Sequence, residues 1–288
     1  MRVGIDVGGS KVNTILLDSN GNVLKSVKYD LLERSEDHLK GLIFKGIEEV
    51  AGDQKILGVG LAVPGEIDHE NGSLKKAPNI SFFEGVKIRD LISEKYGCKV
   101  ELENDANAFA LAESRFGAGK GFNNMVFLTI GTGVGGGIVI GNELYRGMGK
   151  AGEIGHTIII KDGRKCTCGA MGCLEQYASL QGMNFFSMNI LGKEFNSKEL
   201  SKMAETDEKA QEVFHEMGRH LGVGLATLSN ILDPEIIIIG GGLSNVPWIM
   251  ESAEKEMTRY LFSPETRPKV VKSMLGDDAG ALGAASLI

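Results

Sequence analysis

Short apolar runs alternate with segments of helical periodicity along the chain, which predicts strands that alternate with helices. In the first half, β-type runs that end at glycine, Asn-Gly or Pro-Gly predict strands at residues 3–6, 12–18, 22–29, 56–63 and 100–103. Apolar residues three and four positions apart predict helices at residues 39–50, 86–96 and from about 105 to 116. Ser35 is the expected N-cap of the first helix and Gly97 the C-terminal cap of the second.

The second half of the chain starts this pattern again. A strand is expected at 126–130, followed by a glycine turn, GTGVGGG, and a hairpin partner at 138–140. The further elements expected are helices at 175–190, 197–205, 208–232, 246–260 and 279–287, and strands at 235–239 and 270–272. The turns at 6–9 and 131–134 occupy corresponding places, which indicates a weak internal repeat. The alternation is typical of α/β folds, in which ligands bind at the strand ends.

Composition narrows the class of protein. The chain has 288 residues, 42% of them hydrophobic and 24% charged, which is typical of a soluble globular protein of one or two domains. The net charge of −7 argues against a nucleic-acid surface, and no apolar run reaches the ~18–20 residues of a membrane span. The first residues show no signal-peptide core, so we expect a protein of the reducing cytoplasm.

Glycine is the residue type that departs from average usage. The chain has 40 glycines, about twice the usual share of ~7%, and many lie in the clusters IDVGGS, IGTGVGGG and IIIIGGGLS. Glycine turns after buried strands can bind phosphate oxygens through backbone N–H groups, although tight hairpins also use glycine for steric reasons. Asp6 lies at the mouth of the first turn, where a carboxylate suits Mg²⁺. The chain has neither a GxxxxGK[ST] motif nor a dinucleotide-binding fingerprint in its βαβ context.

Three of the four cysteines fall in one short stretch. Cys166, Cys168 and Cys173 follow His156, and three thiolates with one imidazole complete a tetrahedral zinc shell. The alternative is a set of buried or oxidised cysteines, but three cannot pair among themselves and Cys98 is distant in sequence. Four protein ligands leave no open position, so the predicted zinc is structural. Its expected task is to fix the positions of three side chains, Glu153, His156 and Glu175.

Asp105 lies where a strand ends and a helix begins. One interpretation is a helix N-cap or first-turn carboxylate, because helix N-termini favour negative charge. The other is a rigidly held base for a substrate hydroxyl near the phosphate-binding turns. The two roles are compatible, and Asn104 beside it is expected to bind a neighbouring hydroxyl.

Eight motifs in order resemble the ROK family of sugar kinases and sugar-responsive repressors. They are IDVGGSK, LAVPGEID, APNI, ENDANAFALAE, IGTGVGGGIVIG, GEIGH, CTCGAMGCLE and IIGGGLS, and they run from residue 4 to about 244. The resemblance implies the actin-like, hexokinase-type (ribonuclease H-like) fold, with two α/β domains and an interdomain cleft. We expect one domain at 1–105 with 275–288, and a second at 106–274 that carries the zinc loop.

The resemblance also implies roles for individual residues in an ATP-dependent sugar 6-kinase that uses Mg²⁺. Asp105 is similar to the family's catalytic base, and His156, Cys166, Cys168 and Cys173 to its zinc ligands. The expected sugar-binding residues are Gly65, Asn79, Asn104, Asp105, Glu153, His156 and Glu175. The expected ATP and magnesium region comprises Asp6, Gly8, Gly9, Ser10, Lys11, Thr132, Gly133, Gly240, Gly241 and Gly242.

The sequence departs from the family pattern at three places, of which the first is a mild change and the last two bear on the choice of sugar. Ser10 stands where threonine is common, Phe82-Phe83 where many family glucokinases have tryptophan, and Met148-Gly149-Lys150 where a small-residue run is usual. Glucose is the first candidate substrate, and an N-acetylhexosamine kinase or a fructokinase is the alternative. Polyphosphate is an alternative phosphoryl donor. A homo-oligomer, dimer or tetramer, is expected from the family.

From another class, the alternative is a non-catalytic sugar-responsive regulator. The sequence starts at the first phosphate-turn strand rather than with a helix-turn-helix, and it keeps both Asp6 and Asp105. A kinase is therefore the favoured prediction.

Overall fold

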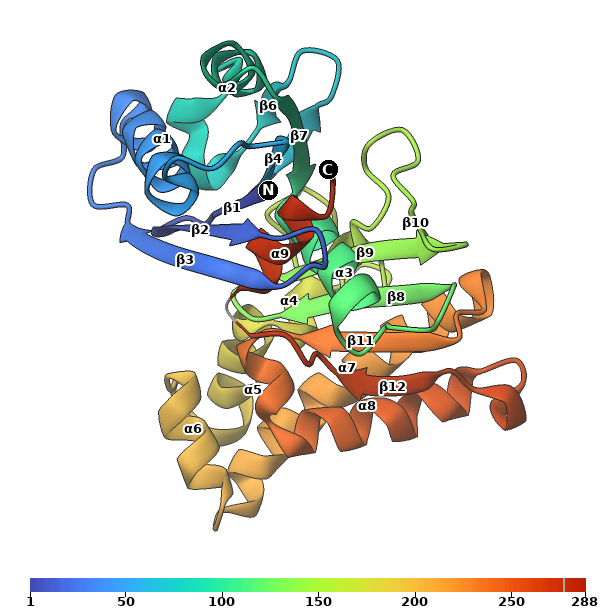
Figure 1. Cartoon of the computed structure of the whole chain (residues 1–288). Helices are drawn as coiled ribbons and strands as arrows, with labels where there is room; N and C mark the ends of the chain where they lie inside the picture. The colour runs from blue at the N-terminus through green and yellow to red at the C-terminus, as the bar shows by residue number, and fades with distance from the viewer. Residues whose placement is uncertain (277) are drawn as a thin grey trace. The chain divides into compact units, whose positions relative to one another are not determined.

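The computed structural model of the chain describes residues 1–276 and 278–288. By their contacts these residues group into two compact units (Figure 1). Unit 1 comprises Met1–Lys120, Arg146–Ala151 and Met274–Ile288, and unit 2 comprises Gly121–Tyr145 and Gly152–Ser273. The domain division expected from the sequence stays a prediction. None of the helices in the described part of the chain combines the length and the apolar character that a membrane span requires.

Unit 1 is built on a five-stranded mixed sheet with the order β3-β2-β1-β4-β7. Its strands are β1 (Arg2–Val7), β2 (Lys11–Leu17), β3 (Val23–Asp30), β4 (Gly58–Val63) and β7 (Lys99–Asn104). β1, β2 and β3 form an antiparallel meander, whereas β1, β4 and β7 are parallel to one another. The carboxyl ends of three neighbouring strands therefore lie at one edge of this sheet.

Helices cover both faces of the unit 1 sheet. Apolar side chains of α1 (Glu36–Ala51) and α2 (Ile88–Tyr96) join the alternate buried residues of β1 and β4 in one core. On the other face, α9 (Ala279–Ala285) packs beside β1 and β4, and α3 (Asp105–Phe116) packs against α9 (Figure 1). A Cβ atom on Gly4 would overlap the backbone of α9, so this close approach requires glycine.

Unit 2 repeats the sheet of unit 1. Its strands are β8 (Met125–Ile130), β9 (Val134–Ile140), β10 (Glu143–Leu144), β11 (Ile236–Gly240) and β12 (Lys269–Lys272). The order is β10-β9-β8-β11-β12, with an antiparallel meander first and two parallel strands after it. The predicted internal repeat is therefore confirmed at the level of topology.

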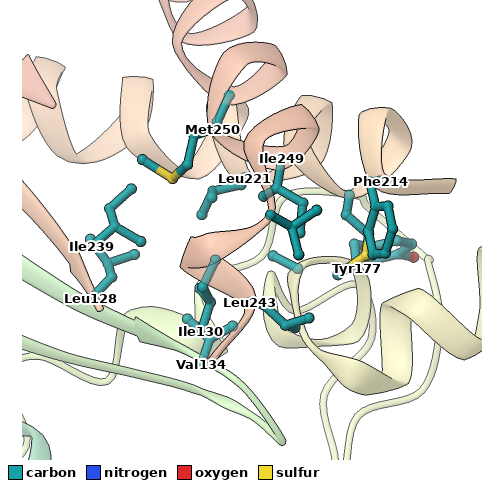
Figure 2. Close-up of a cluster of buried hydrophobic side chains, with 14 of the residues drawn as sticks. Leu128, Ile130, Val134, Tyr177, Phe214, Leu221, Ile239, Leu243, Ile249 and Met250 are labelled. Carbon is teal, nitrogen blue, oxygen red and sulfur yellow. The ribbon is translucent and has the colours of Figure 1, made fainter. Parts of the chain in front are cut away.

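Helices supply most of the core of unit 2. They are α4 (Glu175–Ala178), α5 (Leu180–Leu191), α6 (Ser197–Ala204), α7 (Glu208–Leu232) and α8 (Pro247–Tyr260). Figure 2 shows Leu128 and Ile239 side by side, below Met250 of α8. Leu221 of α7 belongs to the same buried cluster, so the long helix pair lies against the strands that carry the glycine turns.

Most expected elements are confirmed within one or two residues, and the exceptions have local causes. The expected helix at 175–190 breaks at Ser179, whose extended backbone ends α4 and whose side chain caps α5 by accepting from Gln181 N. The expected glycine turn at 131–137 is shorter, because β9 begins at Val134 and takes in its three following glycines. The small hairpin of β5 (Glu66–Asp68) and β6 (Ser73–Lys76) was not expected from the sequence.

Candidate functional site

In unit 1, predicted ligand-binding residues lie at or just after the carboxyl ends of three adjacent parallel strands. Asp6 pairs in register with Ala62 near the end of β4, and Val63 pairs with Asn104 at the end of β7. The segments that carry Asp6, Gly65 and Asp105 are therefore neighbours at one edge of the sheet. This is the edge at which open α/β sheets bind ligands.

Asp6 is the carboxylate most perturbed by its surroundings. Burial, and then the negative charge of Asp105, raise the pKa of Asp6 to about 7. The start of α9 packs so closely on this side chain that a Cβ atom on Gly280 would lie 2.5 Å from Asp6 Cγ. A buried carboxyl group near a second carboxylate is favourable as a charged group only with a cation nearby, which fits the predicted magnesium region.

The turn after β1 exposes backbone to solvent. Gly8 N donates to Lys11 O at 2.8 Å, which closes the turn, and Ser10 O accepts from Leu31 N at 2.8 Å. Gly9 and Ser10 are exposed, and Lys11 starts β2. The turn is therefore fixed at both ends and open at its tip, as a phosphate-binding turn requires.

Asn104, rather than Asp105, is the N-cap of α3. Asn104 Oδ1 accepts from Ala106 N at 2.9 Å and from Asn107 N at 3.2 Å, and Asn104 Nδ2 donates to Gly65 O at 3.1 Å. Asp105 is the first residue of the helix, is exposed, and accepts from Ala106 N at 2.9 Å. The asparagine holds the helix start, and the aspartate next to it presents a carboxylate at the surface of unit 1.

Gly65 and Asn79 lie beside these residues. Gly65 has φ +101°, and a Cβ atom there would overlap Lys76 O, so only glycine fits this crossing of the chain. Asn79 is exposed in the 3-10 helix Pro78–Phe83, and its Cβ lies 3.9 Å from the position of a Cβ on Gly9. The guanidinium of Arg34 donates to Asn79 O. Unit 1 thus brings the predicted sugar-binding Asn79 close to the predicted phosphate turn.

In unit 2, two glycine turns follow adjacent strands. Thr129 of β8 pairs in register with Gly240 of β11, so the turn at Gly131–Gly133 and the turn at Gly240–Gly242 leave the sheet side by side. Gly241 has φ +86°, and a Cβ atom there would overlap Ile130 O. The close packing of the two turns therefore depends on glycine, and both turns have exposed residues at their tips.

The Glu175 side chain is hydrogen-bonded at the end of the turn Gly131–Gly133. Glu175 Oε2 accepts from Val134 N at 3.0 Å, and a Cβ atom on Gly133 would overlap the same oxygen. Glu175 also begins α4, two residues after Cys173. One carboxylate oxygen is thus used to hold the glycine turn.

His156 and the three clustered cysteines form a set with metal-site geometry. One ligand atom from each of His156, Cys166, Cys168 and Cys173 lies within 4.8 Å of all the others. Cys168 Sγ is 3.7 Å from Cys173 Sγ, and Cys166 Sγ is 3.6 Å from His156 Nδ1. Tetrahedral Zn²⁺ with Zn–S bonds of about 2.3 Å separates two sulfurs by about 3.8 Å. The donor set and its spacing fit zinc, and none of the four cysteines, all described, forms a disulfide.

The loop geometry explains how so short a stretch gathers its ligands. Gly169 has φ +97° and Gly172 has φ +82°, and Cys166 N donates to Ala170 O at 2.8 Å across the resulting turn. Burial acts to raise the pKa of the Cys166 thiol, but hydrogen bonds from the backbone and thiol of Cys168, and from Cys173 and His156, lower it to about 7. Cys166 is therefore readily available as a thiolate ligand.

His156 turns its second nitrogen away from the thiols. His156 Nδ1 faces Cys166, whereas Nε2 lies 4.0 Å from Glu153 Oε2. Leu174 N donates to Thr157 O at 2.9 Å, which links the cysteine loop to the segment that carries His156. Within unit 2 the cysteine loop therefore joins Glu153 and His156 to the start of α4 at Glu175.

A buried acid beside Asn104, Glu103, has a role that the sequence motifs do not identify. Glu103 is 1% exposed, and its Oε1 accepts from Asn104 N at 3.0 Å and from Asn107 Nδ2 at 3.0 Å. An acidic residue inside a strand pattern is the only signal in the sequence, and it does not distinguish a buried position from an exposed one.

The sequence is similar to those of known proteins over nearly its whole length. A sequence profile described as ROK family matches residues 2–288. A glucokinase of Thermotoga maritima is 37% identical, over 99% of this chain and 96% of its own length. A xylose repressor of Bacillus subtilis is 32% identical, over 99% of this chain and 76% of its own.

Two solved structures match the fold closely. A ROK hexokinase from Thermus thermophilus has a TM-score of 0.90 and 33% identity, over 99% of this chain and 96% of its own. A ROK family glucokinase from Streptomyces griseus in complex with glucose and AMPPNP has a TM-score of 0.80 and 34% identity, over 99% and 98% of the two chains.

Proposed function

The chain belongs to the ROK family, and from this premise we propose that it transfers the γ-phosphoryl group of ATP to the 6-hydroxyl of glucose. The observation that carries the proposal is the likeness, over nearly the full length of both chains, to a glucokinase that binds glucose and an ATP analogue. The exposed Asp105 carboxylate at the strand edge of unit 1 supports it, because phosphoryl transfer to an alcohol needs a group that accepts the hydroxyl proton.

Asp105 is the proposed catalytic base. The 6-hydroxyl oxygen forms a bond to the γ-phosphorus, the bond between that phosphorus and the bridging oxygen of ADP breaks, and the hydroxyl proton passes to Asp105. Since this transition state is stabilised mainly by positioning and charge neutralisation, the base need not be strong. The N-cap of Asn104 holds the helix start rigid and so fixes the carboxylate.

The other predicted roles are proposed on the same basis. The glucose hydroxyls are bound by Gly65, Asn79, Asn104, Asp105, Glu153, His156 and Glu175. The turns that carry Gly8-Gly9 and Thr132-Gly133 bind the nucleotide phosphates through backbone N–H groups, as their exposed tips allow, and the turn at Gly240–Gly242 binds the nucleoside. Asp6 holds Mg²⁺ directly or through water, and the ion neutralises phosphate charge when bound.

A structural zinc is proposed at His156, Cys166, Cys168 and Cys173. Four protein ligands fill the tetrahedral shell, so this site leaves no position for a catalytic water. With Nδ1 directed to the thiols and bound to the metal, Nε2 carries the ring proton and can donate to a sugar hydroxyl oxygen. The zinc loop therefore orients a substrate ligand without taking part in the chemistry.

The test of the proposal is a coupled assay of ADP release with MgATP and a panel of hexoses. The panel contains glucose, mannose, fructose, N-acetylglucosamine and N-acetylmannosamine, with polyphosphate as a second donor. We expect the highest kcat/KM with glucose and ATP, and a product that glucose-6-phosphate dehydrogenase oxidises. A preference for another sugar would leave the chemistry in place and move the substrate to the N-acetylhexosamine or fructose alternative.

The regulator alternative rests on the likeness to the xylose repressor. It predicts sugar binding in calorimetry, without ADP release, from a folded and zinc-loaded sample. That result would overturn the proposed function.

A further inference from the structure

A loop between two unit 2 segments makes its contacts with unit 1. Arg146–Ala151 belongs to unit 1 by its contacts, although Tyr145 before it and Gly152 after it belong to unit 2. The loop leads directly into the segment that carries Glu153 and His156. The loop is therefore continuous along the chain with the proposed sugar-binding segment.

The main attachment of the loop is an ion pair with a buried acid. Arg146 Nε lies 2.5 Å from Glu103 Oε2, and the Glu103 side chain is 1% exposed while that of Arg146 is 42% exposed. A buried carboxylate is strongly unfavourable without a charged partner and further hydrogen bonds. Glu103 has both, since its other oxygen accepts from Asn104 N and Asn107 Nδ2.

The loop turns around the same arginine. Arg146 O accepts from Gly149 N at 2.7 Å and from Ala151 N at 3.2 Å, so the backbone of the loop closes on Arg146. The second ion pair of the loop joins the exposed Lys150 to Glu66 at 3.4 Å, and it is the weaker attachment because Glu66 also pairs with Lys75 at 3.1 Å. Fixing Arg146 thus fixes the whole loop.

On the other side of the pair, Glu103 controls the start of α3. It is bonded to the backbone of Asn104, the N-cap, and to the side chain of Asn107 in the first turn, with Asp105 between them. We propose that the Glu103–Arg146 pair is a positioning element for phosphoryl transfer, which sets both the helix start that presents Asp105 and the loop that precedes Glu153. The inference rests on the proposed kinase function.

The test compares Glu103→Gln and Arg146→Met, singly and combined, with Glu101→Gln as the matched control. Glu101 lies on the same strand and pairs with Lys99 at 3.0 Å, but both side chains are exposed. Misplacing a reacting group by about 1 Å costs up to ~10²-fold in rate, so we expect each single variant to lower kcat about 10- to 100-fold. The KM for ATP should change less than about threefold, and Arg146→Lys should restore part of kcat.

The double variant tests whether the two residues act as one unit. It should be about as slow as the slower single variant, because the second change removes an interaction that is already lost. Losses that multiply, or a Glu103→Gln variant as fast as Glu101→Gln, would overturn the proposal. Melting temperatures of all variants identify any change that acts only by unfolding, and Arg146→Lys keeps the test open if Glu103→Gln does not fold.

Limited trypsin digestion gives a readout that does not depend on activity. Lys150 is an exposed cleavage site within the loop. Releasing the loop should speed cleavage after Lys150 about tenfold in Glu103→Gln and Arg146→Met, but not in Glu101→Gln. Unchanged cleavage would refute the anchoring of the loop. If the wild-type chain phosphorylates no sugar, the proposed function fails and the digestion alone decides this inference.

Discussion

At the scale of single residues, Asp6 has a pKa well above the ordinary value of an aspartate. Burial and the charge of Asp105 raise its pKa to about 7. In the pH range between about 4 and 7, the unfolded chain has lost the Asp6 proton while the folded chain retains it. The stability that this group contributes is therefore lost as the pH rises from about 4 to about 7, and is gone above the folded-state pKa.

Asp6→Asn should remove this pH dependence. Without magnesium or nucleotide, the wild-type free energy of unfolding should fall between pH 4 and 7, relative to the variant, by about 1 kcal/mol per pH unit. Above pH 7 the difference should be constant. Urea denaturation at a series of pH values measures it, and parallel curves for the two proteins would show that Asp6 is not perturbed.

The sequence pointed to candidate residues at the ends of strands, but not to the hydrogen bonds that their side chains make. Asp6, Gly65 and Asn104 could be predicted to lie near one another because they are at the carboxyl ends of neighbouring parallel strands. Asn104 is the N-cap and Asp105 lies in the first turn because the backbone of Asn104 is extended. The sequence does not determine which of the two residues is the cap. The pairing of Glu103 with Arg146 is a contact between distant residues, and no local pattern encodes it.

At the scale of elements, the cysteine loop depends on two left-handed glycines with different surroundings. A Cβ atom on Gly172 would overlap Ile160 O, whereas one on Gly169 would meet nothing within 4 Å. Gly169→Ala should cost about 1–2 kcal/mol of backbone strain. Gly172→Ala should cost at least about 1–3 kcal/mol more, because the surrounding chain must move. Thermal unfolding compares the pair, and equal losses would mean that the packing at Gly172 is not as described.

Zinc binding is a second property of this loop. Cys168→Ser removes one thiolate, so we expect bound zinc to fall from about one equivalent per chain to nearly none, with a lower melting temperature. Elemental analysis of the purified variant measures the metal directly. Full retention of zinc would exclude Cys168 from the ligand set, and Cys98→Ser, outside the cluster, is the control that should keep its zinc.

Elements were predictable where the hydrophobic period was long and the caps were clear. The helix at 208–232 is confirmed with the expected bounds. The Ser35 cap is also confirmed, because His38 N donates to Ser35 Oγ at 3.3 Å. The break at Ser179 was not predictable, because apolar residues continue through it and the extended conformation of one serine decides it.

At the scale of the whole molecule, the two sheets share one topology although their sequences differ. The antiparallel meander and the two parallel strands recur in both units, and each unit carries its glycine turns at the carboxyl ends of its strands. The alternation of apolar runs along the sequence predicted the elements and a weak internal repeat, whereas the strand order and pairing come from the structure. The proposed homo-oligomeric state cannot be predicted from the pattern of apolar and polar residues. Light scattering of the purified protein measures it.

Ligand binding should stabilise the whole folded chain. A ligand that binds only the folded state at about 100 times its Kd adds about 2.7 kcal/mol to the free energy of unfolding. Glucose with AMPPNP and magnesium should therefore raise the melting temperature by several degrees. Sorbitol at the same concentration is the control, because it reproduces any general solute effect without fitting a hexose site. Equal shifts with glucose and sorbitol would contradict specific binding.

The most direct measurement of the central claim is the turnover of Asp105→Asn with saturating glucose and MgATP. Asparagine keeps the size of the side chain and an oxygen that can accept from Ala106 N, so the start of α3 should be preserved. Without a proton acceptor, kcat should fall by ~10²–10⁴ while calorimetry shows glucose binding within about tenfold of wild type. A variant that turns over at a near-wild-type rate would contradict Asp105 as the base and, with it, the proposed mechanism.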